Sequence, residues 1–271
     1  MKLGFIGGGM MGEAIIAGVL NKGIASPGDI AAADIAAARR EYLTKTYGVR
    51  VSEDPAIACD GNDIVLLAVK PQEFAAAGRS AAGSLNGKQT VMSIMAGVTM
   101  DSIRSTLKHD AVIRAIPNTP AQIGEGMTVW TATDAVSDEG RESVRSVLSV
   151  LGRELYVTDE KYVDMATAVS SSGPAYVYLV VEALIDAAVH IGLRREMATP
   201  MVLQTVLGSA RHAMETGKHP AELRNQVTSP GGTTAEGLLA LEEAGVRAAF
   251  IDAVEAAYEK AKELGGQASA R

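Results

Sequence analysis

The sequence predicts a two-domain α/β protein, in which a doubly wound sheet is followed by an all-helical domain. In the first part of the chain, short apolar runs alternate with stretches of helical spacing, an order typical of parallel strands joined by helices. After about residue 162 the strand pattern stops and only helical spacing follows. We therefore expect one domain over residues 1–162 and a second over residues 163–271.

The strands expected in the first domain are short and apolar. They lie at residues 3–6, 30–34, 64–69, 91–94, 112–116, 127–131 and 154–157. Helical spacing fills several intervals between them, at residues 14–20, 36–47, 100–107 and 137–151. Right-handed crossovers would place these helices on the two faces of a parallel sheet.

The second domain is expected to contain helices at residues 176–191, 196–215, 220–226, 234–244 and 247–264, with a frayed end over residues 267–271. Apolar residues occur almost all the way around the helix at residues 176–191, so it must be buried on most sides. A domain of this size cannot easily enclose such a helix alone. We expect a second copy of the chain to cover it.

Composition excludes several classes of protein. Of the 271 residues, 47% are hydrophobic and 21% are charged, and the formal net charge is −7, so a general nucleic-acid binder is not expected. The single cysteine and the spacing of the four histidines predict no metal site. No apolar run reaches the roughly 18 residues of a membrane span, and the chain start lacks a signal-peptide pattern. We expect a cytoplasmic protein without a membrane segment.

The strongest local signal is a glycine-rich turn near the start of the chain. Gly7, Gly9 and Gly12 form a Gly-x-Gly-x-x-Gly pattern between the first strand and the first helix. The first glycine permits a tight turn, the second admits a pyrophosphate close to the backbone, and the third lets the helix pack on the strand. This Rossmann-type fingerprint predicts a dinucleotide cofactor at the helix N-terminus.

The end of the second strand bears on the choice between NADH and NADPH. Asp34 lies 22 residues after Gly12, where an acidic side chain can accept a hydrogen bond from the ribose 2′-hydroxyl of NADH. Arg39 and Arg40 follow it and could face the 2′-phosphate of NADPH, or they could lie on a solvated helix face. The sequence therefore leaves both cofactors open.

Three further segments carry polar residues that could face a ligand. Lys70 closes an apolar strand at its carboxyl end, where parallel sheets bind ligands, but it could also be an ordinary surface lysine. Asn118 lies in a proline-flanked loop after another strand, as a ligand-facing group or part of a turn. The uncharged loop at residues 228–234 opens a helix; its backbone N–H groups could bind a carboxylate, or its threonines could cap the helix.

Taken together, these motifs resemble those of the pyrroline-5-carboxylate reductase family over nearly the whole chain. The resemblance is carried by Gly4-Phe5-Ile6-Gly7-x-Gly9, Leu67-Ala68-Val69-Lys70-Pro71, Pro117-Asn118-Thr119-Pro120, Ser172-Gly173-Pro174-Ala175-Tyr176 and Val227-Thr228-Ser229-Pro230-Gly231-Gly232-Thr233-Thr234. It implies reduction of the cyclic imine 1-pyrroline-5-carboxylate to L-proline, the last step of proline biosynthesis, with NADPH or NADH. It also implies a homodimer with interleaved helical domains, often assembled into a larger ring of dimers.

The resemblance also implies which residues form the site. With Gly12, Asp34 and Asn118 added from the patterns above, the residues assigned to the cofactor are Ile6, Gly7, Gly8, Gly9, Met10, Met11, Gly12, Asp34, Ala68, Val69, Lys70, Pro71, Ala96 and Asn118. Those assigned to the substrate are Ser229, Gly231, Gly232, Thr233 and Thr234, with the Thr234 hydroxyl as the catalytic partner of the ring nitrogen. Two positions depart from the family pattern. Asp34 stands where relatives that use NADPH often have a small hydroxyl residue, and Pro55 stands where relatives often have an asparagine that contacts the ribose.

Two other classes are compatible with parts of the sequence. A β-hydroxyacid dehydrogenase shares the fingerprint and the helical second domain, but it uses a lysine on the first long helix of that domain. Residues 176–191 contain no lysine. A non-catalytic NAD(P)-sensing protein could also use this fold, but the intact loop at residues 228–234 argues against it.

Overall fold

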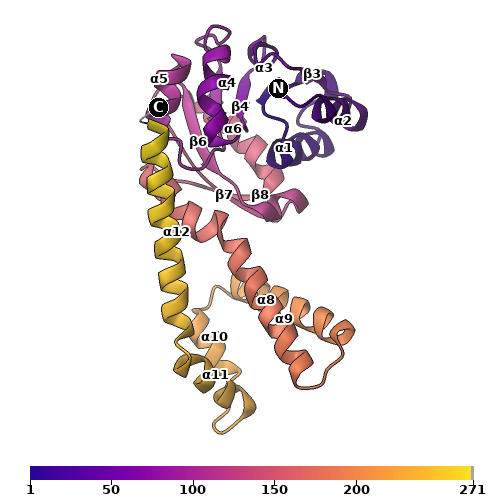
Figure 1. The fold of residues 1–271 in the computed structure, drawn as a ribbon, viewed down its shortest axis with the longest axis vertical. Coiled ribbons are helices and arrows are strands. Elements are labelled where there is room, and N and C mark those ends of the chain that lie inside the picture. Colours follow the sequence, from indigo (N-terminus) through magenta and orange to yellow (C-terminus); the bar gives the residue numbers. More distant parts are fainter. Residues whose placement is uncertain (270–271) are drawn as a thin grey trace. The chain divides into compact units, whose positions relative to one another are not determined.

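The computed structural model describes residues 1–269, with side chains as far as Gly265. The described chain forms two compact units (Figure 1). The first, which we call the sheet unit, comprises Met1–Gly173 and the described chain from Ala256 onward. The second, the helical unit, comprises Pro174–Glu255. The predicted fold class is confirmed: an α/β sheet is followed by an all-helical segment.

The sheet unit contains one eight-stranded sheet with the strand order β3-β2-β1-β4-β5-β6-β7-β8. The strands are β1 (Leu3–Ile6), β2 (Ile30–Ala33), β3 (Arg50–Ser52), β4 (Ile64–Leu67), β5 (Thr90–Ser93), β6 (Val112–Ile116), β7 (Gly126–Ala132) and β8 (Gly152–Tyr156). Seven of them match the expected strands to within a few residues. β3 is not among the expected strands, because this three-residue edge strand is partly exposed and contains only one apolar residue.

One strand pair departs from the expected parallel arrangement. β7 runs antiparallel to β6, with Ile113 opposite Ala132, whereas the other neighbouring strands are parallel. The connection between β6 and β7 holds only the short 3-10 helix η3 (Thr119–Ile123). A parallel crossover needs about a dozen residues or more, so the chain turns back on itself here.

Helices cover both faces of the sheet. They are α1 (Met10–Asn21), α2 (Ala37–Tyr47), α3 (Ala56–Cys59), α4 (Phe74–Ala81), α5 (Met100–Leu107), α6 (Asp138–Leu148) and α7 (Lys161–Ala166). Alternate side chains of the strands enter two separate cores: Leu3 and Phe5 of β1 pack with α1, α2 and α6, whereas Ile6 packs with α3, α4 and α5. The sheet is therefore doubly wound, as predicted.

A buried ion cluster links β6 to α7. The side chain of Arg114 is 1% exposed, donates to Glu160 at 2.8 Å and also pairs with Asp164. Glu160 in turn accepts a hydrogen bond from the backbone N–H of Met100 at 2.8 Å. The guanidinium of Arg114 is thus held by two carboxylates, and the start of α7 is fixed to the sheet.

The helical unit contains α8 (Gly173–His190), α9 (Arg195–Thr216), α10 (Pro220–Gln226), α11 (Thr233–Glu243) and the first part of α12 (Val246–Ser269). These match the expected helices closely. The rest of α12 belongs to the sheet unit, where Leu264 and Gly265 lie against Gly97 in the loop after β5. The backbone of α12 is helical as far as Ser269, and residues 270 and 271 of the segment that is expected to fray lie outside the described residues.

The helical unit exposes many large apolar side chains. Ile185 is the only buried residue of α8. Exposed apolar side chains occur on every helix of this unit except the short α10; they include Val177, Tyr178, Leu179, Leu184, Met201, Leu203, Leu207, Met214, Leu239, Leu241, Phe250 and Ile251. So many exposed large apolar side chains are typical of a surface that binds a partner.

One continuous helical stretch, Lys161–His190, is long and apolar enough to cross a membrane by length and composition alone. Its most apolar 18-residue window has a mean hydropathy of 1.3 and is 11% buried. Helices that are covered by a second copy of a chain have the same composition, so this property does not identify a membrane span.

Candidate active site

The glycine-rich turn connects β1 to α1, as predicted. Gly7 has a φ of +100°, a region that favours glycine, and a Cβ atom there would lie 2.6 Å from the carbonyl oxygen of Ala68. A Cβ atom on Gly12 would lie 2.8 Å from the carbonyl oxygen of Gly7. The fold itself therefore requires both glycines.

Gly9 differs, because nothing within the described protein requires a glycine there. Its φ of −64° suits any residue, and a Cβ atom would meet no heavy atom within 4 Å. Gly9 is the N-cap of α1, is exposed, and provides no side-chain cap. The missing side chain leaves open space beside the first N–H groups of the helix, where an anion can approach the backbone. This space fits the pyrophosphate of a dinucleotide.

Asp34 lies beside the same turn. Its Oδ2 atom accepts a hydrogen bond from the N–H of Gly8 at 2.8 Å, and its Oδ1 atom accepts one from the N–H of Ala36 at 2.9 Å. Each oxygen keeps a second lone pair, so the oriented carboxylate can still accept a hydrogen bond from a ribose hydroxyl. A phosphate at the same position would meet a like charge.

Both nearby arginines are engaged with the protein. Arg39 donates to the carbonyl oxygen of Gly8 and pairs with Glu13. Arg40 donates to the carbonyl oxygens of Asp34 at 2.7 Å and Ile35 at 3.0 Å. The two side chains are only 24% and 21% exposed, so the expectation of a solvated helix face is wrong for both.

Glu13, in the first turn of α1, is a residue that sequence reasoning missed. Its Oε1 atom accepts hydrogen bonds from the hydroxyls of Tyr42 and Tyr47, each at 2.8 Å. Burial acts to raise the pKa of Glu13, but the hydrogen bonds from Arg39, Tyr47 and Tyr42 outweigh it, and the net pKa is lowered. Burial, followed by the interaction with Glu13, raises the pKa of Tyr47 to about 12. At neutral pH, Glu13 is therefore charged and Tyr47 is neutral.

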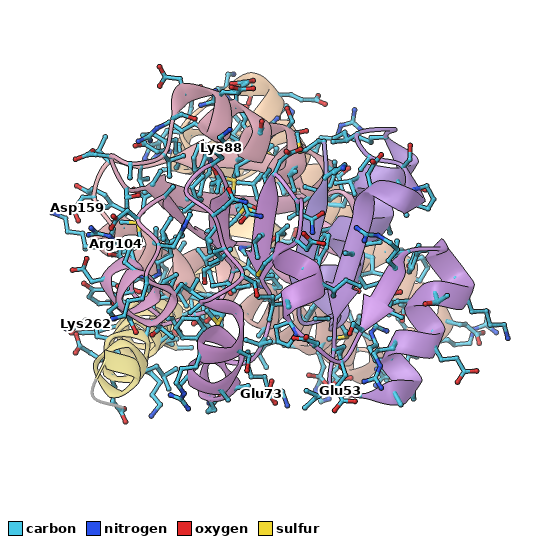
Figure 2. The ribbon with its side chains drawn as sticks, turned by 90° about the horizontal axis from the view of Figure 1, so that it is seen from above. Glu53, Glu73, Lys88, Arg104, Asp159 and Lys262 are labelled. Atoms are coloured by element: carbon cyan, nitrogen blue, oxygen red, sulfur yellow. The ribbon has the colours of Figure 1, made fainter. Side chains whose placement is uncertain are left out.

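The remaining cofactor candidates follow neighbouring parallel strands. Residues 68–71 follow β4, Ala96 follows β5, and Asn118 follows β6. The N–H of Ala68 donates to the carbonyl oxygen of Ile6 at 2.8 Å, which places this loop beside the glycine-rich turn. Figure 2 shows Glu53 and Glu73, which follow β3 and β4, at one edge of the sheet unit, and Lys88, which precedes β5, at the opposite edge. The candidates thus share the carboxyl edge, where parallel sheets bind ligands.

Asn118 also has a role within the protein. Its Oδ1 atom accepts a hydrogen bond from the N–H of Met127 at 2.9 Å, and its Nδ2 atom donates to the carbonyl oxygen of Ser170 at 3.2 Å. Ser170 belongs to η5 (Thr167–Ser171), a π-helical turn between α7 and α8. Asn118 therefore fastens the end of β6 to β7 and to a turn of a kind often found at functional sites.

In the helical unit, the loop at residues 228–234 leads into α11. The N-cap of this helix is Gly232, with no side-chain cap, so the alternative that threonines cap the helix is wrong. The N–H of Ala235 makes the first intrahelical bond, to Gly232 at 3.0 Å, which leaves the N–H groups of Thr233 and Thr234 without one. Among the described residues, the hydroxyls of Ser229, Thr233 and Thr234 have no hydrogen-bond partner. The loop thus offers several free donors and no charged side chain.

The absence of a lysine on α8 bears on the β-hydroxyacid dehydrogenase alternative. The long helix α8 carries Glu182, Asp186 and His190 but no lysine, as the sequence showed. Within the part of the chain that the structure describes, no group of three or more His, Cys, Asp or Glu side chains is arranged to hold a metal ion.

A doubly wound sheet with a Rossmann-type glycine turn, followed by an all-helical unit with an uncharged loop of free N–H groups, is typical of a two-domain NAD(P)H-dependent oxidoreductase. Comparison with known proteins identifies the family. Residues 160–264 match the family model for pyrroline-5-carboxylate reductase dimerisation, and residues 2–97 match the model for NADP oxidoreductase, coenzyme F420-dependent. The chain belongs to the pyrroline-5-carboxylate reductase family, whose members reduce pyrroline-5-carboxylate to proline with NAD(P)H.

Relatives match the chain over almost its whole length. The chain is 45% identical to a pyrroline-5-carboxylate reductase from Synechocystis sp., over 98% of each chain. A solved pyrroline-5-carboxylate reductase from Coxiella burnetii has a TM-score of 0.89 and 34% identity, over 97% of this chain and 98% of that chain. The Plasmodium falciparum enzyme, solved with NADP bound, also has a TM-score of 0.89, with 31% identity and 98% coverage of each chain. The predicted family and activity are confirmed, and the two alternative classes are set aside.

Proposed function

We propose that the chain, in reducing 1-pyrroline-5-carboxylate to L-proline, holds NAD(P)H at the glycine-rich turn and the imine at the loop of residues 228–234. This assignment depends on two helix N-termini that have room or free N–H groups for an anion. Gly9 leaves free space at the start of α1, and Thr233 and Thr234 leave free N–H groups at the start of α11. One position suits a pyrophosphate and the other suits a carboxylate.

The substrate carboxylate would be held by the loop before α11 and its first helical turn. Free N–H groups there, together with Ser229, Gly231 and Gly232, surround an anion without a charged side chain. Each charge-assisted hydrogen bond contributes roughly 1.5–3 kcal/mol. The Thr234 hydroxyl, which can donate or accept, would be the partner of the ring nitrogen.

The cofactor would be held by the glycine-rich turn from Ile6 to Gly12, by Asp34 and by the strand-end residues Ala68, Val69, Lys70, Pro71, Ala96 and Asn118. When bound, NAD(P)H supplies the hydride that reduces C5 of the imine. The protonated imine is already electrophilic, so the protein needs no strong acid–base pair. Its contribution is to bind and orient the substrate, which can supply roughly 7–11 kcal/mol of barrier reduction in favourable cases.

We further propose that two helical domains form the dimer and that the domains divide near residue 162. The match of residues 160–264 to a dimerisation family supports both points, and the exposed apolar surface of the helical unit supports the dimer. Lys161–His190 would then be covered by a second copy of the chain and not by lipid. We also propose a larger ring of dimers and a cytoplasmic location. The net charge of −7 supports the further proposal that the protein has no nucleic-acid partner.

A turnover assay tests the proposal. Purified protein should consume NADH or NADPH when pyrroline-5-carboxylate is added, and proline should appear in equal amount. A folded sample that binds NADP⁺ but turns over with neither cofactor would contradict the assignment. Recovery of the protein from cells without detergent would support the absence of a membrane segment.

A further inference from the structure

Four side chains next to the glycine-rich turn form a cluster that the reaction itself does not use. They are Glu13 of α1 with Arg39, Tyr42 and Tyr47 of α2, and we call them the Glu13 cluster. They lie beside the residues assigned to the cofactor, because Arg39 donates to the carbonyl oxygen of Gly8 and Asp34 accepts from the N–H of the same residue.

Arg39 is held in this cluster from several sides. Its guanidinium pairs with Glu13, lies 4.9 Å from the centre of the Tyr42 ring, and reaches the carbonyl oxygen of Gly9 at 3.5 Å. Glu13 is itself fixed by the hydroxyls of Tyr42 and Tyr47. The positive charge of Arg39 is therefore neutralised by an oriented carboxylate, and moving it would break several interactions at once.

The position of this charge matters for the 2′-phosphate that distinguishes NADPH from NADH. Such a phosphate is stabilised by an arginine that is free to bind it and is opposed by Asp34. Arg40 is already engaged with the carbonyl oxygens of Asp34 and Ile35. Arg39 is thus the other nearby guanidinium, and Glu13 competes for it.

We propose that Glu13 is a specificity-determining residue that acts through Arg39. By holding the guanidinium on the glycine-rich turn, Glu13 withholds it from a 2′-phosphate and shifts the preference of the enzyme toward NADH. This inference rests on the proposed position of the cofactor at that turn.

The test compares the binding of two adenosine ligands that differ at the 2′ position. Adenosine 2′,5′-bisphosphate carries the additional phosphate, and adenosine 5′-monophosphate does not. Calorimetry gives both dissociation constants for the wild type and for Glu13→Gln. We expect Glu13→Gln to improve binding of the bisphosphate relative to the monophosphate by about tenfold, because a released Arg39 gains one charge-assisted contact.

Matched variants show whether the effect passes through Arg39. Glu41→Gln removes the same charge from α2, but Glu41 is exposed and has no hydrogen-bond or ion-pair partner among the described residues, so the ratio should not change. Adding Arg39→Ala to Glu13→Gln should abolish the gain. Tyr47→Phe keeps the Glu13 charge but loosens it, and should give a smaller gain of the same sign.

The outcomes separate this inference from the proposed function. An unchanged ratio in Glu13→Gln, weaker binding of the bisphosphate alone, or equal weakening of both ligands would overturn the role of Glu13 while leaving the cofactor site intact. Failure of the wild-type protein to bind either ligand would overturn the cofactor site and this inference together.

Discussion

The sheet unit and the helical unit differ in how completely they bury their own apolar residues. Strands β1, β2, β4 and β5 are buried along their whole length, and helices cover both faces of their sheet. Within Pro174–Glu255, all of which the structure describes, only Ile185 and Ala198 are buried. The sheet unit is therefore a complete folding unit, whereas the helical unit needs a partner. The structure of the sheet unit can therefore be predicted from its own sequence. For the helical unit, the exposed apolar surface indicates only that a partner exists.

The largest effect expected is loss of assembly when the exposed surface of the helical unit is charged. Leu179→Glu together with Leu207→Glu introduces two carboxylates at positions where the leucine side chains are 65% and 61% exposed in the single chain. Burying these charges at an interface is costly, so we expect monomers in place of dimers at micromolar concentration. Light scattering measures the mass. Ile123→Glu, at an 80% exposed position in the sheet unit, should leave the dimer intact.

Two results would contradict this difference between the units. One is a monomeric wild-type protein at micromolar concentration, and the other is dissociation of the dimer by Ile123→Glu to the same extent as by the double variant. The first result would mean that the helical unit does not need a second copy of the chain, and the second would place the interface outside the helical unit.

The second effect belongs to the core of the sheet unit. Arg114→Met leaves Glu160 and Asp164 beside an apolar side chain, which should lower the free energy of unfolding by about 3–5 kcal/mol. In the helical unit, Arg211→Ala breaks an exposed pair with Glu215 and should cost less than about 1 kcal/mol. Denaturant unfolding measures both. Equal losses of unfolding free energy in the two variants would show that the ion pairs of Arg114 with Glu160 and Asp164 contribute no more than an exposed pair.

The third effect separates catalysis from stability in the helical unit. Thr234→Val removes a hydroxyl without a partner among the described residues. The activation free energy that corresponds to kcat/KM for the imine should rise by roughly 1.5–3 kcal/mol, with little change in Tm. The matched variant is Thr216→Val, outside the loop of residues 228–234, because that hydroxyl donates to the carbonyl oxygen of His212 at 2.7 Å. It should lose about 1 kcal/mol of stability and keep its kinetics. Normal kinetics in Thr234→Val would remove this residue from the active site.

A smaller effect concerns cofactor choice in the sheet unit. Asp34→Ser removes the charge that opposes a 2′-phosphate and keeps a hydroxyl near the N–H of Gly8. The ratio of kcat/KM for NADPH to that for NADH should rise about tenfold. An unchanged ratio would show that Asp34 does not face the ribose.

The smallest effect is a dependence of stability on alkaline pH. The pKa of Tyr47 is about 12 in the folded protein, against an ordinary value of 10.0. Because the folded state holds this proton more tightly, its contribution to stability is complete below pH 10 and is lost as the pH rises toward 12. Tyr47→Phe should reduce the loss of Tm between those values. Identical alkaline profiles would mean that the pKa of Tyr47 is not raised in the folded protein.

The parts of the molecule that local sequence fixes were predicted well. The glycine-rich turn is determined within six residues, because Gly7 needs a positive φ and Gly12 needs close packing. The long helices follow from apolar spacing. β3, α3, α4 and α7 were not among the expected elements, and β3 and α3 each have fewer than five residues, too few for a period to show. The antiparallel direction of β7 follows from the short connection between β6 and β7. The positions of the strands alone do not predict that direction.

The parts of the site that depend on distant contacts could not be predicted in this way. Glu13 meets Tyr47 across 34 residues of sequence, and Asn118 meets Ser170 across 52. Neither pair forms a motif, and both need the completed sheet to bring their elements together. The loop of residues 228–234 was recognised as a block, but only the structure shows that Gly232, and not a threonine, begins the helix.

The return of α12 to the sheet unit makes the helical unit an insertion within a single folded body. Its roughly 80 residues leave the sheet unit after Gly173 and re-enter it at Ala256, where the chain continues to the contact with Gly97. If the helical unit unfolds while the sheet unit stays folded, the unfolded segment is a closed loop and not a free tail. Closure reduces the entropy of that loop, so the tether at both ends favours the folded helices. A single proteolytic cut near Gly217 would remove this constraint without removing any side chain, and would leave two fragments that each hold part of the sheet unit.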